Sequence, residues 1–132
     1  MFVLLVSVLE FVQLPRLLAV LTVESGPTYV DKVSHAPSKD LALLYIEEAL
    51  RDADALRRAG RAGFESGAAF AEFSKIDWDW VRKEVESLRS IAGAKELREV
   101  LAYISAKALA MAQRIRAPSK SEGGEGAQVS SG

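Results

Sequence analysis

The residues with the widest range of chemistry in this chain are gathered in one polar run, Thr-Tyr-Val-Asp-Lys-Val-Ser-His-Ala-Pro-Ser-Lys-Asp, residues 28–40. It holds the sequence's one histidine, His35, together with Lys32 and Lys39. Glycine and proline before and within the run are typical of a connection between helices, and such connections are polar because their backbone groups need water. Taken alone, the run is either a plain connector or a set of side chains that contacts a ligand.

We expect no catalytic residue, metal site or cofactor. A lone histidine in a loop is most often a surface residue, and His35 has no partner at a helical interval that forms a known metal site. The paired carboxylates, Glu47 with Glu48 and Asp77 with Asp79, fall at helix surfaces or starts and do not converge by spacing. The chain has no cysteine, which excludes disulfides, thiolate metal sites and a cysteine nucleophile. The sequence therefore argues against an enzyme.

Charge is segregated along the chain, although the net charge is only −1. Residues 40–54 hold five acids and one arginine, a net of −4, whereas residues 89–120 hold seven bases and two acids, a net of +5. Lysine and arginine bind a nucleic-acid backbone through counterion release without reading bases, but cations near a helix end also offset its dipole. On charge alone, the candidates for contact with nucleic acid are Arg57, Arg58, Arg61 and Arg116.

Aromatic side chains offer a second way to hold nucleic acid, because bases stack on them. Trp78 and Trp80 are two residues apart and would point to different sides of a helix, so we expect at least one in the core. Tyr29, close to Lys32, is the more exposed candidate for stacking.

The apolar periodicity predicts a mainly α fold, a compact helical bundle of about four helices. Residues 1–116 would form one helical domain, and residues 117–132, which have almost nothing to bury, a disordered tail. The region 60–75 is ambiguous: three glycines favour a loop, three phenylalanines need burial, and a short hairpin is the less favoured alternative. The first expected helix covers residues 2–23 and should bend or break at Pro15, and a short helical turn follows at Thr28. The second helix runs from the N-cap Ser38 to Gly60, and the third from the N-cap Asp77 to Ile91. The inner face of the third helix would hold Trp80, Val81, Val85 and Leu88, and the fourth helix would run from Ala94 to Arg116.

The apolar amino-terminal run, residues 1–23, raises the question of a membrane span. Glu10 and Arg16 lie inside it, and each charge at mid-bilayer costs about 3 kcal/mol on insertion scales. We therefore expect a buried helix in a cytoplasmic protein, with docking on a partner protein as the alternative. The lack of asparagine and cysteine beside abundant arginine, glutamate and alanine is a pattern expected at high temperature, so we expect a thermophilic source.

Two segments, in this order, resemble parts of the small subunit of archaeal type I-A CRISPR Cascade complexes. Residues 26–40, Gly-Pro-Thr-Tyr-Val-Asp-Lys-Val-Ser-His-Ala-Pro-Ser-Lys-Asp, are followed by a helix and resemble the amino-terminal part of that family. Residues 101–114, Leu-Ala-Tyr-Ile-Ser-Ala-Lys-Ala-Leu-Ala-Met-Ala-Gln-Arg, are followed by a polar tail and resemble its carboxy-terminal helix. The two pieces span roughly half of the chain between them, and neither is a catalytic signature.

The resemblance implies a non-catalytic, mainly helical subunit that lines the belly of a crRNA-guided complex. Such subunits assemble along the backbone subunits and help to hold target or displaced DNA, so the implied partners are other effector subunits, crRNA, target DNA and further copies of the chain. The matching positions that would contact nucleic acid are Lys32, Lys39, Lys107 and Arg114. Family members can carry a longer middle region with strands, and the corresponding region here is short.

A helical adaptor or oligomerisation protein without nucleic-acid contact is the alternative. The last expected helix carries apolar residues at alternating steps of four and three, the seam of a packed or coiled helix. That seam and the apolar first helix would then dock on a protein partner. The seam residues are Leu97, Leu101, Ile104, Ala108, Met111 and Ile115.

Overall fold

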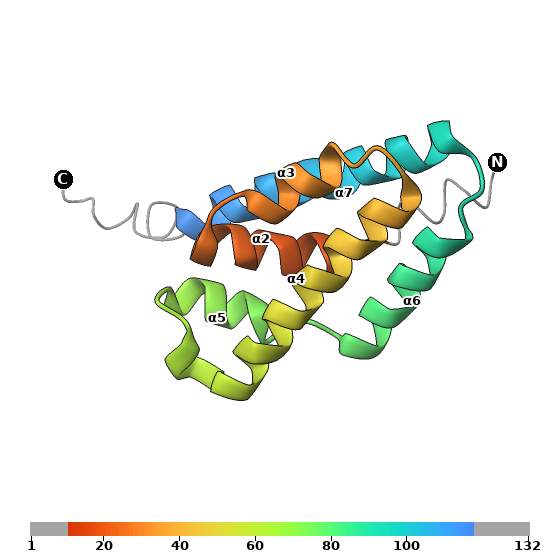
Figure 1. Ribbon diagram of the computed structural model, residues 1–132. Coiled ribbons are helices and arrows are strands. Elements are labelled where there is room, and N and C mark those ends of the chain that lie inside the picture. Colours follow the sequence, from red (N-terminus) through yellow and green to blue (C-terminus); the bar gives the residue numbers. More distant parts are fainter. Residues whose placement is uncertain (1–10, 118–132) are drawn as a thin grey trace.

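The protein is a bundle of helices in the computed structural model, which describes residues 11–117 (Figure 1). Within this range there is no strand, so the prediction of a mainly α fold is confirmed and the hairpin considered for residues 60–75 is wrong. Residues 1–10 and 118–132 lie outside the described part, so only Ala117 of the predicted tail is described. The elements are α2 (Gln13–Ser25), α3 (Thr28–Ser34), α4 (Lys39–Ala59), the 3-10 helix η1 (Gly60–Gly63), α5 (Gly67–Phe73), α6 (Trp78–Ser90) and α7 (Ala94–Arg116).

The described residues form six α-helices rather than about four, because two short segments are helices of their own. The turn predicted at Thr28 is the seven-residue helix α3, which has no side-chain cap at its amino terminus. In the region that was ambiguous, α5 begins at the N-cap Ser66, whose hydroxyl accepts a hydrogen bond from the backbone N–H of Ala69. Ala69 and Phe73 lie four residues apart, about one helical turn, and both are on the buried face of α5.

Helix α2 is the centre of the bundle, packed along α7 and also against α3, α5 and α6 (Figure 1). Leu17, Leu18 and Val20 expose at most 1% of their surface, so they point to different sides of the helix and all of them are covered. A helix that is apolar all round needs such a position. The expectation of a buried first helix therefore holds for residues 13–22.

Pro15, where the sequence predicts a bend or a break, lies in the first turn of α2, which begins at Gln13. Proline is tolerated there because the first turn has no backbone acceptors to offer its N–H groups. The preceding N–H groups are bound by a carboxylate from α6, which is described below.

The predicted ends of α4 and the start of α6 are confirmed. The Ser38 hydroxyl accepts from the N–H of Leu41 at 3.2 Å, and the Asp77 carboxylate accepts from the N–H of Trp80 at 3.1 Å. Helix α4 stops at Gly60, whose φ of 67° is a conformation that side chains disfavour. The predicted inner face of α6 is wrong at Trp80, which is 37% exposed, whereas Trp78 is half-buried.

Candidate nucleic-acid interface

Four aromatic rings meet where α4 ends and α6 begins, and we call this cluster of Phe64, Phe70, Phe73 and Trp78 the aromatic corner. The centroid of the Phe64 ring lies 5.4 Å from that of Phe70 and 5.0 Å from that of Phe73. Phe73 continues the cluster to Trp78, at 5.5 Å and edge to face. The turn through η1 and the short helix α5 bring these rings together, with Phe64 and Phe73 buried beneath.

Two arginines from the end of α4 and from η1 lie over this corner. The guanidinium carbon of Arg57 is 4.4 Å from the centroid of the Trp78 ring, and that of Arg61 is 5.8 Å from the centroid of Phe70. Cations over aromatic faces gain about 0.5–2 kcal/mol. Arg61 also donates to the carbonyl oxygen of Phe64 at 2.9 Å. Among residues 11–117, neither arginine forms an ion pair with a carboxylate.

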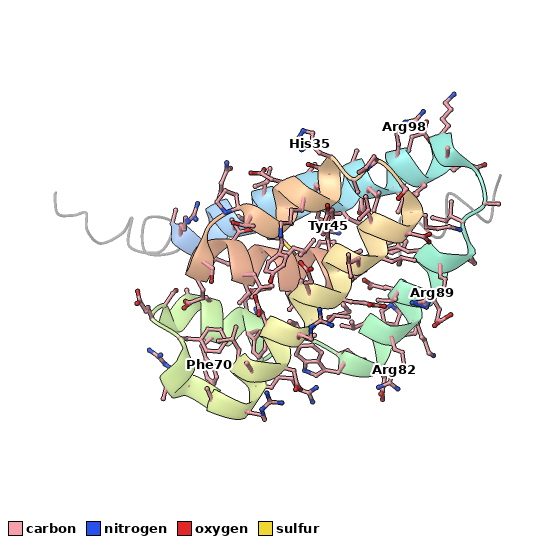
Figure 2. The ribbon with its side chains drawn as sticks, viewed as in Figure 1. His35, Tyr45, Phe70, Arg82, Arg89 and Arg98 are labelled. Atoms are coloured by element: carbon pink, nitrogen blue, oxygen red, sulfur yellow. The ribbon has the colours of Figure 1, made fainter. Side chains whose placement is uncertain are left out.

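An open groove of about 380 Å³ runs from this corner between α4 and α6. Its floor is apolar and its edges are charged, and Figure 2 shows two of its arginines, Arg82 and Arg89, projecting from α6. The floor consists of Leu50, Trp78, Val81 and Val85, and the edges consist of Glu47, Asp54, Arg57, Arg82, Glu86 and Arg89.

The charges on the edges of the groove are compensated unevenly. At the end away from Trp78, Arg89 pairs with Glu47 at 3.7 Å and with Glu86 at 3.5 Å. Near the aromatic corner, Arg82 has one distant partner, Asp79 at 4.0 Å, and both side chains are largely exposed. Asp54, also at this end, pairs with Arg58. Arg57 has no carboxylate partner among the described residues.

The polar run that suggested a contact surface holds α3 against α4. The Tyr29 hydroxyl donates to the Asp52 carboxylate at 2.5 Å, and burial together with this hydrogen bond raises the pKa of Tyr29 to about 12. Lys32 pairs with Glu48 at 3.6 Å and lies over the rings of Tyr29 and Tyr45. His35 points outward at the end of α3 (Figure 2), where its Nδ1 is 2.9 Å from the carbonyl oxygen of Asp31.

Two of the predicted contact residues bind backbone carbonyls at helix ends. The ammonium of Lys39 donates to the carbonyls of Arg89 and Ile91, at 3.0 and 2.5 Å, where α6 ends. The guanidinium of Arg116 donates to the carbonyl of Thr22 in the last turn of α2, at 3.1 Å. Their hydrogen-bonding capacity is therefore partly used within the fold.

Lys107 and Arg114 lie on one flank of α7, seven residues apart and therefore about two turns. The Lys107 ammonium donates to the Tyr103 hydroxyl at 3.3 Å and lies over that ring. Arg114 is exposed and pairs with no carboxylate in the part of the chain that the structure describes. The structure thus separates the predicted residues: Arg57 and Arg61 lie over the aromatic corner, Arg58 pairs with Asp54, and the others lie elsewhere.

Sequence reasoning missed Glu84, which is 3% exposed in α6 and binds the start of α2. Its carboxylate accepts from the backbone N–H groups of Val12, Gln13 and Leu14, at 2.8–3.0 Å. Burial raises the pKa of the Glu84 carboxyl, although these three hydrogen bonds and the charge of Lys107 act in the opposite direction. A signal existed, because residues 81, 84, 85 and 88 form one stripe on which Glu84 is the single charge.

No helix in residues 11–117 is long and apolar enough to cross a membrane. Nor do three histidine, cysteine, aspartate or glutamate side chains of this range come close enough together to hold a metal ion.

Comparison with known proteins identifies a relative from the archaeon Archaeoglobus fulgidus, described as an uncharacterized protein. It is 43% identical over 110 residues, which cover 83% of this chain and 93% of the relative. No family model matches the sequence, and no solved structure matches it either. The match therefore spans most of both chains.

Proposed function

The chain belongs to the same protein family as this Archaeoglobus fulgidus protein, and we propose that it is a non-catalytic small subunit of a type I-A CRISPR effector complex. In this role it contacts guide RNA or target DNA through the backbone, without reading sequence, and assembles with other subunits of the complex. The resemblance of residues 26–40 and 101–114 supports the assignment to the complex. The aromatic corner supports contact with nucleic acid.

The observation that carries nucleic-acid contact is the position of Arg57 over Trp78, at 4.4 Å and without a carboxylate partner among the described residues. A guanidinium over a ring can still donate hydrogen bonds, and phosphate oxygens are acceptors that match its geometry. Phe70 and Trp78 are half-buried, and accessible ring surface beside such cations is a combination found in proteins that bind single strands without sequence preference.

The two segments that carry the resemblance lie side by side, which supports their belonging to one functional surface. Helix α3, from the first segment, packs along α7, from the second (Figure 1). This surface is separate from the aromatic corner, so one face can meet neighbouring subunits while the corner meets nucleic acid.

The proposal is tested by fluorescence anisotropy with a labelled single-stranded DNA and a labelled single-stranded RNA at low salt. We expect binding of both, and a decrease of about tenfold in affinity for Arg57→Gln/Arg82→Gln on every sequence, because phosphate contacts carry no sequence information. Arg98→Gln is the matched control: Arg98 is an exposed arginine on α7, far from Arg82 in Figure 2, and its removal should leave the affinity unchanged. Absence of binding, both alone and in a reconstituted effector complex, contradicts the proposal.

The outer face of α7 favours a second candidate function, that of a helical adaptor without nucleic-acid contact. Leu109 is 41% exposed there, and small residues around it allow close approach of another helix. An adaptor would form oligomers that persist at high salt, and the Arg57→Gln/Arg82→Gln variant would assemble as the wild type does. The small exposed residues are Ala102, Ala106 and Ala110.

A further inference from the structure

The groove between α4 and α6 has the properties of a site for a small planar group. Its volume of about 380 Å³ falls within the range of about 300–1,000 Å³ that is usual for ligand sites. Val81 and Val85 form the floor from α6, Leu50 closes it from α4, and the half-buried indole of Trp78 stands at one end. These groups offer dispersion and stacking but no hydrogen bonds, apart from the indole N–H.

The two ends of the groove differ in how far their charged side chains are paired. At one end, Arg89 is held between Glu47 and Glu86, so that end attracts neither anions nor cations strongly. At the Trp78 end, Arg57 has no carboxylate partner in the described range, and Arg82 has a single distant one. An occupant that fits must therefore be flat and apolar on the floor and negatively charged beside Arg57 and Arg82.

We propose that this groove receives one base of a single-stranded nucleic acid, with the adjoining phosphate between Arg57 and Arg82. A nucleotide combines the required planar, weakly polar ring with an anion a short distance away. Because the floor has no set of donors and acceptors to match a base edge, the site accepts any base. The inference rests on the proposed function and deepens it, since backbone contact alone would not need the groove.

The chain offers a built-in reporter for this contact. It contains two tryptophans, and Trp80 is 37% exposed with its ring facing Lys83 at 4.8 Å, away from the floor of the groove. The Trp80→Phe variant therefore leaves Trp78 as the sole tryptophan without altering a residue that lines the groove. Its emission then reports whether a base comes into contact with Trp78.

The experiment is a titration of full-length Trp80→Phe with two strands of equal length, one of oligothymidylate and one with the same backbone but abasic sugars. We expect the thymidylate strand to quench Trp78. We expect the abasic strand to bind at least about tenfold more weakly and to leave the emission unchanged, because a stacked base contributes on the order of 1–3 kcal/mol and the backbone contributes equally in both strands.

The outcomes separate this inference from the proposed function. Equal affinity for the two strands, or tight binding of thymidylate without quenching, overturns the base site and leaves backbone binding in place. Absence of binding of either strand, measured by anisotropy on the same samples, overturns both. Trp78 emission that responds to protein concentration instead of DNA would assign the groove to a second copy of the chain and also overturn the base site.

Discussion

Charged side chains have different roles in two regions of this molecule, the aromatic corner and the helix ends. At the corner, Arg57 and Arg61 lie over rings and pair with no carboxylate of the described residues. At the helix ends, a capping set binds backbone groups of other helices. This set consists of Glu84 at the start of α2, Glu24 before α5, Lys39 at the end of α6 and Arg116 at the end of α2.

The difference shows that a count of charges along the sequence does not identify a binding surface. Lys39 and Arg57 are both basic residues of α4, one at each end of the helix. Lys39 donates to two carbonyls that would otherwise be left without partners where α6 ends. A ligand would have to replace those hydrogen bonds to recruit Lys39, whereas Arg57 can bind an anion without leaving Trp78.

The largest expected effect is a loss of stability on removal of the Glu84 carboxylate. Glu84→Ala leaves three N–H groups at the start of α2 without an acceptor, and we expect the free energy of unfolding to fall by about 3 kcal/mol. Urea denaturation followed by circular dichroism measures this. The control is Glu86→Ala, two residues away and exposed, which should cost less than about 0.5 kcal/mol. Equal losses in the two variants would show that Glu84 does not cap α2.

A smaller effect is expected at the basic end of α7. The triple variant Lys107→Ala/Arg114→Ala/Arg116→Ala should bind single-stranded DNA about threefold more weakly than the wild type, because two of the three cations already bond groups of the protein. Anisotropy at the same salt as for the corner variant gives the comparison. If the triple variant loses more affinity than Arg57→Gln/Arg82→Gln, the principal contact surface is α7 and not the aromatic corner.

The smallest expected effect is a dependence of stability on pH that comes from Glu84. Burial raises its pKa in the folded protein above the ordinary value of 4.5, so the folded state binds more protons than the unfolded state between the two values. The contribution of Glu84 to stability should therefore fall as the pH rises through this window. Comparison of Tm for the wild type and Glu84→Gln, from about pH 4 to about pH 7, isolates that contribution. A wild type that gains stability relative to Glu84→Gln over the same range would show that the three hydrogen bonds outweigh burial.

Local signals in the sequence predicted much of the fold. Ser38 and Asp77 were recognised as N-caps and Gly60 as a stop, because capping depends on residues within one turn. The buried character of α2 followed from its composition alone. The structure between α4 and α6 was harder to predict, because its glycines and phenylalanines fit a loop, a hairpin or a short helix. Tertiary packing decides among these.

The features that depend on distant residues could not be predicted. Glu84 and Leu14 are 70 positions apart, and no local pattern connects a carboxylate in one helix with the N–H groups of another. Arg57 was nominated on charge, but its position over Trp78 arises from the turn through α5. Trp80 was assigned to the inner face of α6 together with its neighbour Val81. The buried stripe of α6 consists of Val81, Glu84, Val85 and Leu88, and Trp80 lies beside this stripe.

The salt dependence of single-strand binding tests the central claim most directly, because its slope counts the phosphate contacts that a protein makes. Arg57→Gln/Arg82→Gln should reduce the slope of log K against log salt by about 1.4, at about 0.7 for each contact to a single strand. Lys39→Gln/Arg116→Gln removes the same formal charge from the capping set, and we expect it to leave the slope unchanged, with folding verified by circular dichroism. An equal reduction in the two variants, or none at the corner, would contradict the distinction between arginines that meet nucleic acid and cations that hold the fold.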